Sequence, residues 1–137
     1  MRTLSRILRP RLEATAHCDL PCGVYDPAQA RIEAESVKAI QEKFQGNDDP
    51  SFRARAIEIK EQRSDLVKHH LWVLWTDYFK PPHFEKYPQL NQLFNEATKL
   101  AGGGAGGTKS STDVAAADQL LAKIEEISKI FWETKQG

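Results

Sequence analysis

The residues with the widest choice of chemistry in this chain stand together in the segment EATAHCDLPCGVYDP, residues 13–27. The segment contains both cysteines of the chain, Cys18 and Cys22, and His17 directly precedes the first of them. A Cys-x-x-x-Cys pair can form a disulfide, act as a redox dithiol or bind a metal ion. Two thiols and one imidazole are one ligand short of a structural zinc site. All three uses of the cysteines therefore stay open at this point.

The sequence before His17 has the features of a removable leader. Residues 1–16 carry four arginines and one acid, and they end in the small-x-small sequence Ala14-Thr15-Ala16, which resembles a processing site. The arginines interrupt every stretch that could serve as the hydrophobic core of an export signal. A disordered basic tail is the alternative interpretation. We expect a leader at residues 1–16 that is cleaved without export, and we therefore expect a cytoplasmic protein whose thiols stay reduced until metal arrives.

Cleavage between Ala16 and His17 would create a chelating N-terminus. The new α-amine, the backbone nitrogen of Cys18 and the Cys18 sulfur would close two five-membered rings on one metal ion. Cys22 would supply the fourth ligand in the plane because Pro21 bends the chain back, and the His17 imidazole would sit on the axis. Planar N₂S₂ coordination with an axial nitrogen suits nickel(II) or copper(II) rather than zinc. Because the uncut chain has no such amine, cleavage would switch on metal binding.

Four amphipathic segments follow, each bounded by helix start and stop signals. An acid before proline is a helix start, and glycine or a proline pair is a helix end. No segment alternates convincingly between polar and apolar residues with a period of two, so strands are not expected. The expected helices run from Asp26-Pro27 to Gly46, from Asp49-Pro50 to Pro81-Pro82, from near Pro88 to Leu100, and from about Thr112 to Glu133.

Four amphipathic helices with mostly short connections are best satisfied by an antiparallel four-helix bundle. We therefore expect an all-α fold, with a bundle at residues 26–137 and a metal-binding hook at residues 17–25 before it. The exception among the connections is GGGAGGTKSST, residues 102–112, here called the glycine-rich connection. Its composition predicts a flexible linker.

Two charged residues occur in the apolar stripes that the periodicity predicts for the first two helices. Glu33 lies in line with Val37, and Arg63 lies in line with Ile59 and Leu66. If both stripes face the core, Glu33 and Arg63 must pair, because a buried charge costs several kcal/mol or so unless it is paired. Half-solvated positions at the edges of the two stripes are an equally good interpretation.

The charge distribution bears on the partners of the chain. The 137 residues include 19 basic and 19 acidic side chains. Without residues 1–16, which hold four arginines and one glutamate, 15 basic and 18 acidic residues remain, a net charge of −3. A mildly acidic body argues against nucleic acid as the main partner. No apolar run approaches the length that spans a bilayer, which argues against a membrane protein.

The segment HCDLPCGVYDPAQARIEAESVKAIQEKF closely resembles the mature start of the nickel-containing superoxide dismutases, and the resemblance continues through KEQRSDLVKHH, LWTDYFKPPHFEKYPQL and IFWETK. It implies a homohexamer of four-helix bundles with one nickel ion per subunit, made with a leader that a dedicated peptidase removes. It also implies dismutation of superoxide to oxygen and hydrogen peroxide as nickel alternates between its divalent and trivalent states. A nickel-binding carrier and a redox-sensing helical module are the alternatives. The surplus of aromatic side chains at residues 72–79 fits a subunit interface, although a deeply buried helix would show the same surplus.

The resemblance assigns His17, Cys18 and Cys22 as the metal ligands. It assigns Glu33 and Arg63 as the pair that orients the axial imidazole, which is the usual task of residues around a metal site.

The resemblance also implies how substrate is handled. Tyr25 and Tyr78 would hold small anions or water near nickel, Lys80 would attract the superoxide anion, and Asp19 would shape the hook. Taken alone, the two tyrosines would be ordinary packing residues and Lys80 an ordinary surface charge.

Overall fold

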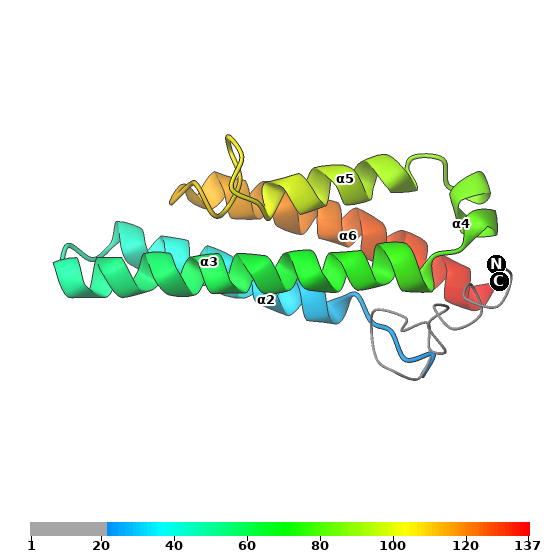
Figure 1. The fold of residues 1–137 in the computed structure, drawn as a ribbon, viewed down its shortest axis with the longest axis horizontal. Coiled ribbons are helices and arrows are strands. Elements are labelled where there is room, and N and C mark those ends of the chain that lie inside the picture. The colour runs from blue at the N-terminus through cyan, green and yellow to red at the C-terminus, as the bar shows by residue number, and fades with distance from the viewer. Residues whose placement is uncertain (1–21) are drawn as a thin grey trace, which may run out of the picture.

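The computed structural model describes residues 22–137, which form a bundle of helices (Figure 1). The expected leader and three residues of the expected site, His17, Cys18 and Asp19, lie outside the described residues. No strand occurs between residues 22 and 137, as expected. The elements are α2 at Ala28–Gln45, α3 at Pro50–Val73, a π-helical turn η1 at Leu74–Tyr78, α4 at Pro81–Lys86, α5 at Leu90–Leu100 and α6 at Val114–Gln136.

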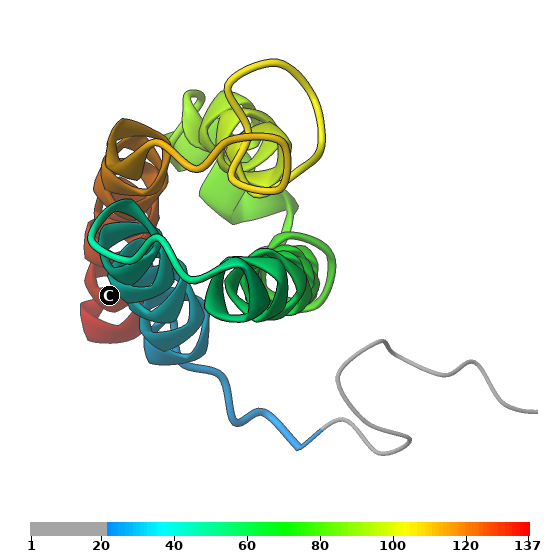
Figure 2. The same cartoon turned by 90° about the vertical axis from the view of Figure 1, so that its left-hand side faces the viewer.

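The four long helices form an antiparallel bundle. The view along the bundle places α2, α3, α5 and α6 at the corners of a square, and each runs against its two neighbours (Figures 1 and 2). Helix α2 packs against α3 and α6, and α5 packs against α6 and α3. The expected all-α, four-helix bundle is confirmed. The start of α2, the turn η1, helix α4 and the C-terminus all lie at one end of it (Figure 1).

Side-chain caps fix where the helices begin. The Asp49 carboxylate accepts a hydrogen bond of 2.8 Å from the Phe52 backbone N–H, and Pro50 is the first residue of α3. The Asp26 carboxylate accepts from the Ala28 N–H at 2.8 Å, but α2 begins at Ala28, one residue later than the sequence predicted. The second predicted helix also changes character, because its last turn is the π-helical η1 and a separate short helix, α4, follows.

The buried face of α3 coincides only in part with the stripe that the periodicity predicts, which runs through Phe52, Ala56, Ile59, Arg63, Leu66, His70 and Val73. Its buried residues are Ala56, Lys60, Ser64, Val67, Leu71 and Val73, whereas Phe52, Ile59, Arg63, Leu66 and His70 are only half-buried. The prediction holds at Ala56 and Val73 but was wrong between them, because two polar residues, Lys60 and Ser64, interrupt the true stripe. Apolar periodicity therefore selected the neighbouring flank of the helix, on which Arg63 lies.

Lys60 and Ser64 can be buried because the glycine-rich connection supplies their hydrogen-bond partners. The Lys60 ammonium donates to the carbonyl oxygens of Thr108 at 2.5 Å, Lys109 at 2.8 Å and Ser111 at 3.0 Å, and Lys60 is 2% exposed. The hydroxyls of Ser64 and Thr108 are 2.8 Å apart. Burial lowers the pKa of Lys60, and the three carbonyls are the acceptors that a buried cation needs. The connection is thus bound to α3, and the expectation of a flexible linker was wrong.

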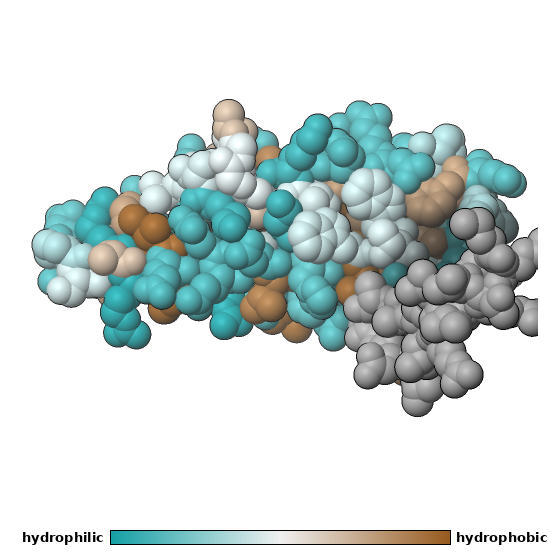
Figure 3. Space-filling view, in the orientation of Figure 1, coloured by the Kyte–Doolittle hydropathy of each residue, from teal (hydrophilic) through white to brown (hydrophobic). Residues whose placement is uncertain are grey.

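The face drawn in Figure 3 is largely hydrophilic, with separate hydrophobic areas rather than one continuous band. Between residues 22 and 137, no helix is both long and apolar enough to cross a membrane. Within this described part of the chain, the large apolar side chains that remain exposed are Val24, Ile32, Ile57, Trp72 and Trp132.

Candidate metal centre

Cys22 is the one expected metal ligand within the described residues. Its side chain is exposed, and its sulfur accepts a hydrogen bond from the Val24 backbone N–H at 3.4 Å. Gly23 between them has a φ of +70°, a left-handed conformation that a side chain would strain. A sulfur that is exposed and supported by a backbone donor fits a metal with affinity for thiolate, such as nickel. Between residues 22 and 137, no group of three or more His, Cys, Asp or Glu side chains is placed to hold a metal ion.

The two tyrosines of the expected site meet at the end of the bundle where α2 begins. The ring centroids of Tyr25 and Tyr78 are 5.6 Å apart, with an angle of 56° between their planes. Tyr78 is the last residue of η1, and its ring also packs on that of Phe131 in α6, with 4.4 Å between the ring centroids. The backbone from Cys22 to Tyr25 thus brings the Cys22 sulfur and the tyrosine pair to the same end of the molecule. Neighbouring aromatic rings contribute about 0.5–1.5 kcal/mol beyond their buried area, which fixes the pair.

The Tyr78 hydroxyl has a partner that the sequence did not reveal. Its oxygen lies 2.7 Å from the hydroxyl of Thr134, near the C-terminus of α6. The Lys135 ammonium lies over the Tyr78 ring at 5.0 Å from its centroid. No periodicity or motif links residues so far apart in the chain. The signal that could have pointed to Thr134 is its position in the quoted segment IFWETK.

Lys80 follows η1 at the same end of the bundle. Its side chain is exposed and makes no ion pair with any carboxylate between residues 22 and 137. The Lys80 backbone N–H donates to Nδ1 of His83 at 3.0 Å, and the His83 ring lies nearly parallel to that of Tyr78, 5.9 Å away. His83 therefore serves the local fold, by accepting a hydrogen bond from the backbone before α4.

Glu33 and Arg63 lie further along the bundle, where α2 packs against α3. Nη1 of Arg63 is 3.2 Å from Oε2 and 3.4 Å from Oε1 of Glu33. The Arg63 side chain is 40% exposed and that of Glu33 is 17% exposed. Both interpretations of the sequence therefore hold in part, because the two charges pair and they do so at the edge of the core. An ion pair this exposed stabilises a fold by about 0–1 kcal/mol.

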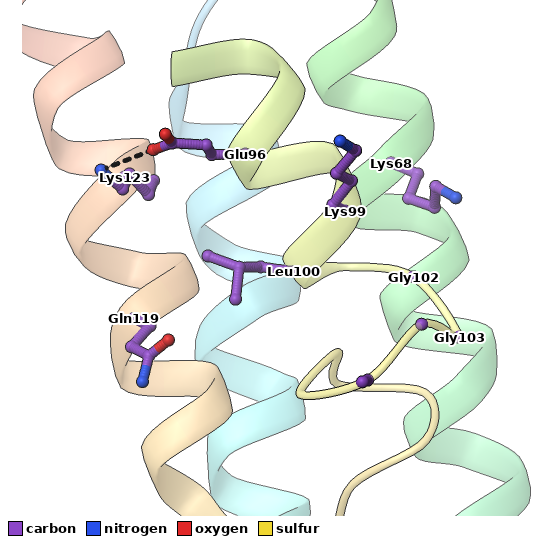
Figure 4. Close-up of a pocket in the computed structure, with 10 residues that line it drawn as sticks. Lys68, Glu96, Lys99, Leu100, Gly102, Gly103, Gln119 and Lys123 are labelled. Carbon is purple, nitrogen blue, oxygen red and sulfur yellow. Dashed lines mark ion pairs between the residues drawn. The ribbon is translucent and has the colours of Figure 1, made fainter. Parts of the chain in front are cut away.

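A hollow of about 650 Å³ lies elsewhere, over the C-terminal end of α5 beside the glycine-rich connection (Figure 4). Lys68, Lys99 and Lys123 contribute to its lining, and Lys123 is paired with Glu96 at 2.8 Å. Lysines near a helix C-terminus favourably oppose the partial negative charge of its carbonyls. The lining contains neither cysteine nor histidine, so this hollow does not offer the ligands of a nickel site.

Comparison with known proteins places this arrangement in a family. The family model described as nickel-containing superoxide dismutase matches residues 12–135. The superoxide dismutase [Ni] of Streptomyces coelicolor is 62% identical over 134 residues, which cover 98% of this chain and 99% of that protein. The corresponding protein of Streptomyces seoulensis has the same identity and coverage. A solved native structure of a nickel superoxide dismutase superposes with a TM-score of 0.83 at 64% identity and covers 88% of this chain and all of its own. The chain therefore belongs to the nickel-containing superoxide dismutase family.

Proposed function

We propose that this chain is a superoxide dismutase that binds one nickel ion per subunit through His17, Cys18 and Cys22. The observation that carries the proposal is the exposed, N–H-supported sulfur of Cys22 on the short segment that leads to the Tyr25–Tyr78 pair, in a chain of this family. The chemistry that bound nickel supplies is one-electron exchange, by which two superoxide ions and two protons become oxygen and hydrogen peroxide. The fold's own task is to hold the ligands and to admit a small anion.

Two features of the relatives support a leader at residues 1–16, a hook at residues 17–25 and a bundle at residues 26–137. The curated relatives match 98% of this chain. The native solved structure, matched over its whole length, covers only 88% of this chain, or about 121 of 137 residues, so that about 16 residues of this chain have no counterpart in it. The variants named for solved relatives change a histidine numbered one, an aspartate numbered three and a tyrosine numbered nine. His17, Asp19 and Tyr25 have this same spacing. A peptidase that cleaves after Ala16 is the partner implied.

The residues around the ligands have separate tasks in this proposal. The Glu33–Arg63 pair orients the His17 imidazole, and its location at the edge of the core leaves it accessible to a side chain outside the bundle. Tyr25 and Tyr78 lie beside the place proposed for the metal, where the pair would hold water or a small anion, and the direction of the Tyr78 hydrogen bond, derived below, narrows the task of Tyr78 to water and other protonated molecules. Lys80, which has no ion pair among residues 22–137, attracts superoxide by its charge, and salt would weaken this attraction. Asp19 shapes the hook.

The test of this function is superoxide consumption by nickel-loaded protein that begins at His17. Pulse radiolysis would follow the decay of superoxide for the wild type and for Cys22→Ser, with the nickel content of both measured. We expect rapid decay with the wild type and none above background with Cys22→Ser. Bound nickel without any consumption of superoxide by the wild type would contradict the proposal and indicate a nickel carrier.

Assembly and location are further parts of the proposal. Trp72 is 47% exposed and Trp132 is 48% exposed, which is consistent with a homohexamer in which copies of the chain cover such side chains. The exposed Cys22 thiol favours the cytoplasm, where thiols stay reduced until metal binds. Light scattering after gel filtration would give the mass of the assembly, and a mass of one chain would exclude the hexamer.

A further inference from the structure

The hydrogen bond between Tyr78 and Thr134 has a defined direction. The Tyr78 and Thr134 hydroxyl oxygens are 2.7 Å apart, and the Thr134 oxygen is 2.6 Å from the Phe131 carbonyl oxygen. A carbonyl oxygen can only accept, so the single proton of the Thr134 hydroxyl goes to Phe131. The proton between the two hydroxyls must then belong to Tyr78. Tyr78 donates to Thr134, and Thr134 donates to Phe131.

This direction decides what Tyr78 can offer to a small molecule. A phenol carries one proton, and once that proton is given to Thr134 the oxygen has only lone pairs left. It can accept a hydrogen bond from water or hydrogen peroxide, but it cannot donate one to superoxide. We propose that Thr134 is a positioning residue that makes Tyr78 a hydrogen-bond acceptor, so that Tyr78 favours protonated molecules over anions. The inference rests on the proposed place of Tyr78 beside the metal.

The surroundings of Tyr78 hold its ring in the orientation that this bond requires. The ring packs on Phe131 at 4.4 Å and lies nearly parallel to His83 at 5.9 Å, while the Lys135 ammonium lies over it at 5.0 Å. Phe131 is fully buried, so the carbonyl that accepts the last of these hydrogen bonds belongs to a fixed part of α6. The last two turns of α6 therefore place both the ring and the acceptor of its proton.

The matched variants are Thr134→Val, which keeps the shape but removes the hydroxyl, and Thr134→Ser, which keeps the hydroxyl. The first readout is ultraviolet resonance Raman spectroscopy of the metal-free full chain, with Tyr78→Phe subtracted to isolate the Tyr78 signal. We expect a donating Tyr78 in the wild type and in Thr134→Ser, and loss of that signature in Thr134→Val. The same Tyr78 signature in wild type and Thr134→Val would overturn the inference.

The second readout is the binding of azide, a small anion, to the nickel-loaded protein. In Thr134→Val the Tyr78 hydroxyl has no Thr134 oxygen to donate to and can donate its hydrogen bond to the anion. We therefore expect azide to bind about 2- to 10-fold more tightly, the range that one net hydrogen bond gives. Thr134→Ser should match the wild type, and the gain should vanish when Tyr78→Phe is added to Thr134→Val. A gain that persists in the double variant would contradict the inference.

Tyr78→Phe alone separates this inference from the function on which it rests. If Tyr78 is an acceptor, removing its oxygen does not weaken azide binding, whereas weaker binding would show a donor and overturn the inference. Failure of the proposed function has another signature, which is nickel-loaded protein that consumes no superoxide. The Raman measurement needs neither metal nor turnover, so it tests the direction of the hydrogen bond in either case.

Discussion

Replacement of the buried ammonium of Lys60 is the perturbation whose effect on stability the structure defines best. Lys60→Met keeps most of the aliphatic stem but removes three hydrogen bonds to carbonyl oxygens. A hydrogen bond to a charged group contributes about 1.5–3 kcal/mol, and an abandoned buried acceptor costs about 1–3 kcal/mol. Only the bond to Thr108 is fully buried, and water can replace the ammonium at Lys109 and Ser111. The variant also avoids the cost of burying a charge, so we expect a net loss of about 2–4 kcal/mol.

The assay is urea unfolding at one fixed chain concentration, followed by circular dichroism, because assembly also contributes to stability. Lys68→Met is the matched control, since Lys68 lies on the same helix but is not buried, and its ammonium lies over the Trp72 ring at 5.6 Å from the centroid. We expect the control to change the free energy of unfolding by less than about 0.5 kcal/mol. A Lys60→Met protein within about 0.5 kcal/mol of the wild type would refute the claim that Lys60 binds the glycine-rich connection to the bundle.

Three further predictions concern other parts of the molecule. Arg63→Leu should lower the free energy of unfolding by at most about 1 kcal/mol, because the Glu33–Arg63 ion pair is partly exposed. The same variant should lower nickel affinity about 10- to 100-fold, measured by competition with a chelator. An unchanged affinity would show that the ion pair does not support the metal site. Gly107→Ala should lower the free energy of unfolding, measured in urea, by about 1–3 kcal/mol, because the new Cβ would overlap the Gly102 carbonyl oxygen. Gly103→Ala is the control, since a Cβ there meets no other atom and should leave the stability unchanged. Equal effects of the two substitutions would contradict the tight turn. The hydrogen bond from Lys123, and to a smaller extent the one from Gln92, holds the pKa of Glu96 below its usual 4.5. The Glu96 carboxylate therefore stabilises the fold above about pH 4.5, and this contribution is lost as the pH falls through the lower pKa of the folded state. The stability difference between wild type and Glu96→Gln should therefore be constant above that pH and shrink below it in urea titrations, and a difference that grows on acidification would reverse the sign.

The fold could be predicted because its helix boundaries rest on local chemistry. The cap of α3 depends on Asp49, Pro50 and the N–H of Phe52, which are neighbours in sequence. The buried face of α3 could not be predicted in the same way. Lys60 is buried only because three carbonyls of a distant connection accept from it, and the periodicity of one helix carries no information about that connection.

In the candidate site, too, features that depend on neighbouring residues could be predicted, whereas contacts that depend on tertiary packing could not. The Cys22 sulfur has a backbone donor and Tyr25 packs against Tyr78, but the roles that a short motif and a family resemblance assigned to these residues stay predictions. The partnership of Tyr78 with Thr134 depends on how the end of α6 packs beside η1, which is a property of the tertiary structure. The glycine-rich connection shows the same limit, since its composition predicts flexibility but Thr108 within it is fully buried.

The most direct test of the central claim is the nickel content of cut and uncut protein. Protein that begins at His17 and protein that retains residues 1–16 would be loaded with nickel under identical anaerobic conditions and counted for bound metal after gel filtration. We expect close to one nickel per chain in the cut form and very little in the uncut form, because His17 carries an α-amine only in the cut form. Equal or negligible nickel in both forms would contradict the link between cleavage and metal binding. It would favour the interpretation that Cys18 and Cys22 form a disulfide or act as a redox dithiol.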